Sequence, residues 1–169
     1  MTTDIDDQTL ADYLRRAYHA VDGLWFMMVE QDSDFDHALD LDRRVWEVLA
    51  KIQARKAREL LRVAGDSPQD LARCFSLKLA ADGHTFDVDT DPGGVRVTIH
   101  NCPWLVLLEN SDRRHLAARV AQTICPTEGR LWCAEFGGEY DFEMPRMACR
   151  GEAGCEMVFR AKSAEAISE

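Results

Sequence analysis

The sequence lacks any long apolar run, and no segment approaches the roughly 20 consecutive apolar residues that a membrane-spanning helix requires. Its first ten residues are acidic and polar, without the basic start and apolar stretch of a secretory signal peptide, so we expect a cytoplasmic protein. Glycine and proline are few, ten and five among 169 residues, which excludes a collagen-like chain or a proline-rich linker. Repeats and low-complexity segments are also absent. We therefore expect one globular domain over residues 1–169.

Basic residues are scarce. Twenty Lys and Arg stand against thirty Asp and Glu, which gives a formal net charge of −10. Such a surface repels phosphate backbones and anionic lipid, so we expect neither nucleic acid nor a membrane as a partner. A small-molecule ligand or substrate is the expected partner, and a homodimer is left open.

The first half of the chain, residues 1–83, has the apolar spacing of helices. The first helix carries an apolar stripe, and its Gly23 is a candidate bend. The stripe consists of Leu10, Leu14, Ala17, Val21, Leu24, Trp25 and Met28. A second helix is expected to begin at a Ser33 cap and to stop at Gly65, and a third to run from Ser67-Pro68 to Gly83.

The second half, residues 84–160, changes to the period-two alternation of strands. Asp91-Pro92-Gly93-Gly94 is a turn between two such segments and predicts a hairpin. Two helices are expected next, then two strands, and residues 161–169 form a polar tail. The helices span about Ser111–Ile124 and Pro126–Phe136, and the strands span Glu139–Met144 and Cys155–Arg160. The predicted class is α+β, with a helical amino-terminal half packed on a small antiparallel sheet with two further helices.

Five of the six cysteines lie in the last 68 residues. Without a secretory context they are expected as free thiols, metal ligands or catalytic groups rather than disulfides. Cys102, Cys125 and Cys155 fall at the predicted ends of elements, whereas Cys74 and Cys133 lie inside helices on apolar faces and read as core residues. No CxxC pair is present.

Two kinds of chemistry suit the cysteines. Cys102, Cys125 and Cys155, with Cys149, Glu128 or His100 as a fourth ligand, would hold zinc or iron in a tetrahedral site. Alternatively, Cys125 is a nucleophile at the start of a helix, where free N–H groups favour a thiolate, with Glu128 as its acid or base one turn later. The Cys-Pro dipeptides at Cys102 and Cys125 are also typical of haem-regulatory sequences, in which the thiolate ligates iron.

A second group of candidates lies on the first helix. His19 and Asp22 are three residues apart and share a helix face, as a general base held by a carboxylate requires. We expect this face, with Trp25, to cover the cysteine site as a lid. Trp104 and His100 flank Cys102 and are the other expected ligand-binding residues.

The order Cys102-Pro103, then Cys125 with an acid three residues on, then Gly151 and Cys155, resembles the L-2-amino-thiazoline-4-carboxylic acid hydrolase family. The closing Gly…Cys strand is more loosely similar to small-ligand-binding 4-vinyl reductase domains. The resemblance covers about residues 95–160, and the helical half is similar to uncharacterised bacterial and archaeal proteins. It implies hydrolytic opening of a cyclic amidine, with Glu128 standing where the family has an Asp.

Three functions follow as hypotheses. The first is a hydrolase of a small cyclic C–N substrate that uses thiolates and Glu128, with or without a metal. The second is a non-catalytic module that binds a small ligand and in which the cysteines hold zinc, iron or haem. The third is a partner-binding helical protein whose cysteines are incidental.

Overall fold

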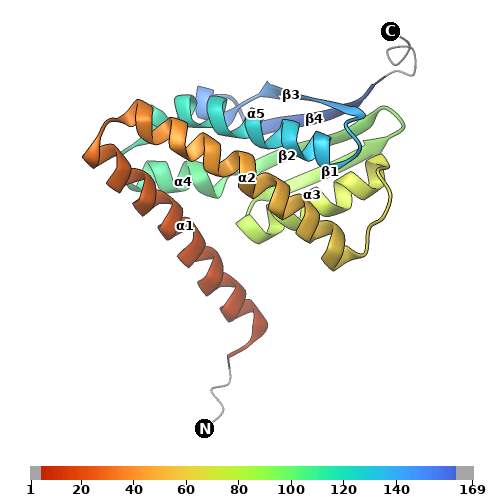
Figure 1. The fold of residues 1–169 in the computed structure, drawn as a ribbon, viewed down its shortest axis with the longest axis horizontal. Helices are drawn as coiled ribbons and strands as arrows, with labels where there is room; N and C mark the ends of the chain where they lie inside the picture. The colour runs from red at the N-terminus through yellow and green to blue at the C-terminus, as the bar shows by residue number, and fades with distance from the viewer. Residues whose placement is uncertain (1–4, 163–169) are drawn as a thin grey trace.

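The helical first half and the sheet-bearing second half are both present in the computed structural model, which describes residues 5–162. The helices are α1 (Asp7–Asp32), α2 (Phe35–Leu61), α3 (Pro68–Asp82), α4 (Pro103–Asn110) and α5 (Ala117–Glu135). The strands are β1 (Thr85–Asp91), β2 (Gly94–Asn101), β3 (Tyr140–Arg146) and β4 (Cys155–Ala161), with short 3-10 turns η1 (Arg114–Leu116) and η2 (Ala148–Arg150). The predicted α+β class is confirmed (Figure 1). The predicted tail lies largely outside the described residues.

The boundary between the first two helices differs from the prediction. α1 is continuous through Gly23, because nothing packs near that residue to bend the helix. Ser33 closes α1, with its hydroxyl donating to the Val29 carbonyl at 2.8 Å, and Asp34 caps α2 by accepting the His37 amide. α2 ends at Leu61 rather than at Gly65, since Arg62 itself adopts the left-handed conformation.

α3 and the hairpin are confirmed. Ser67 and Asp70 form a capping box around Pro68, and Gly83 ends the helix in the left-handed conformation. β1 and β2 pair antiparallel in the register that sets Val88 opposite Val97. These features depend on residues close together in the chain, and for that reason the sequence predicts them correctly.

The prediction of two helices separated at Cys125-Pro126 is wrong. α5 runs through Pro126, and α4, which the sequence did not predict, begins at Pro103 with Cys102 as its cap residue. A proline within a helix removes one backbone hydrogen bond. Burial of Ile124 and Glu128 on either side of that proline holds the helix together. Cys125 therefore lies inside a helix rather than at its start.

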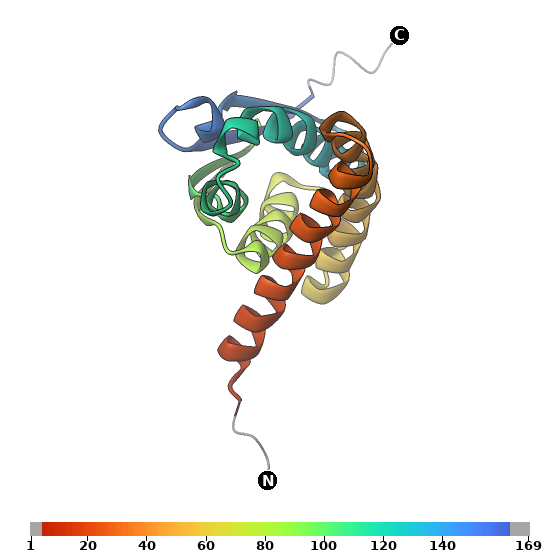
Figure 2. The same ribbon diagram turned by 90° about the vertical axis from the view of Figure 1, so that its left-hand side faces the viewer.

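The four strands form one antiparallel sheet in the order β1-β2-β4-β3. α3 and α5 pack on one face of it, and α2 packs against both helices (Figures 1 and 2). The core between these layers is aromatic at its centre, where Phe75 contacts Trp132 and Phe159 edge-on. Cys74 and Cys133 are buried in this core, as the sequence predicts.

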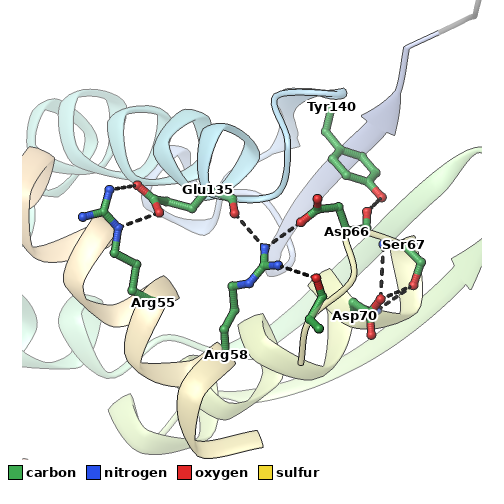
Figure 3. A network of polar contacts seen from close by, with 8 residues as sticks. Arg55, Arg58, Asp66, Ser67, Asp70, Glu135 and Tyr140 are labelled. Carbon is green, nitrogen blue, oxygen red and sulfur yellow. Dashed lines mark hydrogen bonds and ion pairs between the residues drawn. The ribbon is translucent and has the colours of Figure 1, made fainter. Parts of the chain in front are cut away.

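A polar network joins the far ends of the helices to the sheet (Figure 3). The Arg58 guanidinium at the end of α2 donates to the Asp66 carboxylate at 2.6 Å and to the Glu135 carbonyl at 2.9 Å. The Tyr140 hydroxyl of β3 donates to the Asp66 carbonyl, also at 2.6 Å. The network thus ties α2, the loop before α3, the end of α5 and β3 together.

α1 packs on the rest of the chain along only part of its surface. His19 is its one buried residue, and its amino-terminal half projects beyond the other elements (Figures 1 and 2). The apolar stripe that the sequence shows is exposed: Leu14, Val21 and Trp25 have 56%, 67% and 60% of their surface accessible. Even so, among residues 5–162 no helix combines the length and apolar character needed to cross a membrane.

Candidate functional site

A cavity of about 110 Å³ lies between the helices and the sheet. Its wall is mostly apolar, with Leu105 and Leu108 from α4, Ile124 from α5 and Met157 from β4. Trp104 also lines it, and its ring packs edge-on against Trp46 of α2 with 5.5 Å between ring centroids. A cavity of this size and polarity accepts a small organic molecule.

Four cysteines from four chain segments line this one cavity: Cys102, Cys125, Cys149 and Cys155. β2 and β4 are neighbours with Ile99 opposite Cys155 at the start of β4, so Cys102, three residues after Ile99, follows β2 at the same end of this strand pair. The Cys155 sulfur accepts the Ala148 amide at 3.3 Å. The structure therefore places these four cysteines on the wall of one cavity.

The thiols are held in their neutral form. Burial raises the pKa of Cys102 to about 11, and the backbone N–H groups of Leu105 and Trp104 oppose this shift only in part. Burial also raises the pKa of Cys125 well above its ordinary value, so the predicted helix-start thiolate is wrong for that residue. The reason is its position inside α5, where no free N–H groups are available.

A buried ion-pair network, which the sequence analysis missed, stands at the cavity wall. The Lys78 ammonium of α3 lies 2.6 Å from the Glu128 carboxylate and 3.2 Å from that of Asp82, and all three side chains are buried. Burial alone lowers the pKa of Lys78, but the two carboxylates outweigh it and raise the pKa, so the lysine stays charged. Glu128 is therefore paired with Lys78 rather than free to act on Cys125.

A signal for this network exists in the sequence. Leu71, Phe75, Lys78 and Asp82 follow one another at spacings of four, three and four, so the lysine and the aspartate occupy the apolar face of α3. A charged residue on a buried face requires a partner of opposite charge. The i, i+4 pair supplies Asp82, but Glu128 comes from another element and only the fold reveals it.

Two further carboxylates line the cavity without a cation beside them. Burial raises the pKa of Asp22 to about 6, with Asp82 adding to the shift, and raises that of Asp42 to about 7, with Asp22 adding to it. No ion pair to either carboxylate occurs among the described residues. His84 also lines the cavity, and burial lowers its pKa to about 4, so it carries no compensating charge at neutral pH.

Only part of the α1 face that was predicted to cover the cysteine site lies at the cavity. Asp22 lines the cavity, and His19 is buried behind Trp104, with 4.4 Å between the two ring centroids. His19 Nε2 has no hydrogen-bond partner within the described part of the chain, and burial lowers the pKa of the ring. Trp25 is on the exposed side of α1 and does not line the cavity, so its expected role as a ligand-binding residue is not supported.

His100 is also displaced from the site. Strand alternation turns Ile99 into the core and His100 outward, where its Nε2 lies 2.7 Å from the exposed Asp87 carboxylate. It does not line the cavity. Within residues 5–162, no three His, Cys, Asp or Glu side chains already stand in an arrangement that would hold a metal ion.

A family model described as a family of unknown function, DUF6125, matches residues 6–101, more than half of the chain. The chain belongs to this family. No curated protein and no solved structure matches it. The DUF6125 match covers α1, α2, α3 and the hairpin, which supply Asp22, Asp42 and Lys78. The four cavity cysteines follow the matched segment, and the resemblance of that part to the hydrolase family stays a prediction.

Proposed function

We propose that the protein binds a small organic cation with an apolar body in this cavity. The observation that carries the proposal is the pair Asp22 and Asp42, two half-buried carboxylates in a mostly apolar wall that form no ion pair among residues 5–162. Lys78 offers no compensation, since Glu128 and Asp82 already surround it. A buried carboxylate without a partner is costly, and a bound cation offsets that cost.

The apolar part of the cavity wall indicates that the body of the ligand is hydrophobic. Trp104, Leu105 and Ile124 present hydrophobic surface, and the neutral thiols behave as small apolar groups. The ligand class is therefore a compact hydrophobic amine or amidine. The cyclic amidine that the hydrolase resemblance implies belongs to this class.

The cavity supports binding better than hydrolysis. Hydrolysis through Cys125 needs a thiolate and a free carboxylate, whereas burial keeps the thiol protonated and Lys78 holds Glu128. We therefore favour the non-catalytic ligand-binding hypothesis of the sequence analysis over the hydrolase.

Calorimetric titration with benzamidine, neutral benzamide and anionic benzoate tests the proposal. We expect benzamidine to bind and the other two to bind at least tenfold more weakly. Asp42→Asn is expected to remove that preference, whereas Asp89→Asn, an exposed aspartate of β1, should retain it. Because the pKa of Asp42 is about 7, benzamidine affinity should fall as pH drops from 8 to 6. Equal binding of benzamide and benzamidine would refute the proposal.

The cysteine wall favours a second function, retention of zinc or iron. Thiolates are good ligands for both metals, and four sulfurs from separate segments on one cavity supply the number that a tetrahedral site requires. The Ala148 amide that donates to Cys155 would help to stabilise that thiolate. Binding would release the thiol protons, because the metal is held by thiolates.

Metal analysis of protein purified without oxygen tests this second function. We expect about one metal per chain, with Cys125 alkylated faster after a chelator is added. Cys155→Ala should reduce the metal content, while Cys74→Ala, which removes a core cysteine away from the cavity, should not. Metal-free protein whose Cys125 reacts at one rate with and without chelator would exclude it.

A further inference from the structure

The projecting helix α1 carries an apolar stripe that nothing in the described chain covers. It consists of Leu10, Tyr13, Leu14, Ala17, Ala20, Val21, Leu24 and Met28, all of them exposed, and we call it the α1 stripe. Leu10, Leu14, Ala17, Val21, Leu24 and Met28 alternate at spacings of four and three, the pattern with which one helix packs along another. At 1.5 Å per residue the stripe is about 28 Å long.

The stripe contains no charged residue, although the chain carries a net charge of −10. The charges of this part of α1 lie on its other sides, among them Asp12, Arg15 and Arg16. An isolated helix end without packing is marginal in water, and His19 is the only buried residue of the 26 in α1. The projecting half of α1 therefore needs an apolar partner.

We propose that the α1 stripe is the interface with a second copy of this chain, in which the two α1 helices pack antiparallel across a two-fold axis. The stripe is its own complement in this orientation. Leu10 faces Met28 of the other copy and Leu14 faces Leu24, while the small Ala17 faces Val21 near the axis and lets the helices approach. In each of these pairs one residue comes from the first half of the stripe and the other from the second half, so both copies use the same surface.

Charge also favours a second copy at this surface. Two chains of net charge −10 repel each other over most of their surfaces, and the α1 stripe lets them meet without placing like charges in contact. The cavity does not take part, because Asp22 lines it while the α1 stripe faces away from the body of the chain. The interface is thus independent of what the cavity binds.

Sedimentation of the full chain tests the proposal. We expect twice the chain mass across a wide range of concentrations, and the single chain mass for Leu14→Glu/Leu24→Glu. Arg16→Glu is the matched control: it changes the net charge by the same two units on the exposed polar side of α1 and should stay dimeric. Both sites are exposed in the single chain, so circular dichroism should show the sheet and the remaining helices intact.

Disulfide trapping tests the orientation, since α1 has no cysteine of its own. Ala20→Cys, close to the two-fold axis, should form a covalent dimer under mild oxidation. Ala11→Cys, about 13 Å along the helix from it, should not, because its antiparallel neighbour lies at the other end of the stripe. A wild-type chain that sediments as a monomer, or equal trapping at Ala11 and Ala20, would overturn the proposal.

Discussion

Lys78 sets the charge balance of the cavity. It is one buried cation between two buried carboxylates, with the rings of Trp46 and Phe75 within 5.8 Å of its ammonium. Replacing a buried ion pair as a whole is often neutral, whereas removing one member leaves an uncompensated charge. Removal of the Lys78 ammonium would leave the Glu128 and Asp82 carboxylates buried without a paired cation.

We expect Lys78→Met to destabilise the protein by about 3–5 kcal/mol, because Glu128 and Asp82 lose the one cation that pairs with them among residues 5–162. Urea unfolding measures the change, and Lys78→Met/Glu128→Gln should recover part of it. Lys56→Met, which breaks the exposed pair with Glu59, should cost at most about 1 kcal/mol. Equal effects of Lys78→Met and Lys56→Met would show that the buried network does not bear on stability.

Asp42 makes the folded state less stable as pH rises. Its pKa is about 7 in the folded chain against an ordinary 3.8, so between these values the folded state binds more protons than the unfolded state. Stability from this group is therefore present at low pH and is lost as pH rises toward 7. Asp42→Asn should raise the melting temperature at pH 8 and leave it nearly unchanged at pH 4. The lowered pKa of His84 changes stability with pH in the opposite direction, but it is present in both the wild type and the variant and does not affect the difference between them.

At the scale of elements, α5 is the most informative helix because its two halves serve different sites. Ile124, Cys125 and Glu128 face the cavity, while Trp132 lies in the core behind it. The Thr127 hydroxyl donates to the Thr123 carbonyl at 2.8 Å, one turn earlier and beside Pro126. Pro126 is typical of the first residue of a helix, but the burial of residues on both sides of it keeps α5 continuous.

Two glycines, both inside helices, allow a matched comparison. A Cβ on Gly129 of α5 would meet the Phe142 ring of β3 at 2.4 Å, whereas a Cβ on Gly23 of α1 would meet nothing within 4 Å. We expect Gly129→Ala to cost about 1–3 kcal/mol through overpacking and Gly23→Ala to add about 0.5–1 kcal/mol through helix propensity. Chemical unfolding of both variants checks the opposite signs, and a stabilising Gly129→Ala would contradict the close approach of α5 to β3.

At the scale of the whole molecule, one polar network that joins the elements lies away from the cavity. The Arg58 network joins α2, α5 and the sheet, yet none of Arg58, Asp66, Glu135 and Tyr140 lines the cavity (Figure 3). Arg58 also stacks over Phe136, with 4.7 Å to the ring centroid. Its planar guanidinium therefore holds the loop before α3 against the end of α5.

Arg58→Lys should lower the free energy of unfolding by about 1–3 kcal/mol, since an ammonium cannot reproduce the guanidinium's divergent hydrogen bonds. Arg55→Lys is the comparison, because Arg55 also binds Glu135 but is 69% exposed, and it should cost less than about 1 kcal/mol. Thermal unfolding ranks the two variants. The reverse ranking would mean that the network in Figure 3 does not tie the elements together.

The sequence by itself determined the features that depend on neighbouring residues. The capping box at Ser67, the stop at Gly83 and the hairpin turn at Asp91 each involve side chains within a few residues of the backbone that they shape. The α+β class followed from the change of apolar period at residue 84. The expectation that Cys102, Cys125 and Cys155 share one site rests on their predicted places at element ends, although Cys125 lies inside a helix.

Only the tertiary structure decided which groups share the cavity and which face of each helix is covered. Asp42, Lys78 and Glu128 come from three helices, and burial and their charged neighbours shift their pKa values only after those helices pack. Trp25 and His100 have side chains suited to ligand binding, but the packing of α1 and the alternation of β2 turn them outward. The apolar spacing of α1 predicted a helix correctly, and the fold left that stripe exposed because His19 and Asp22 occupy the side that meets the rest of the chain.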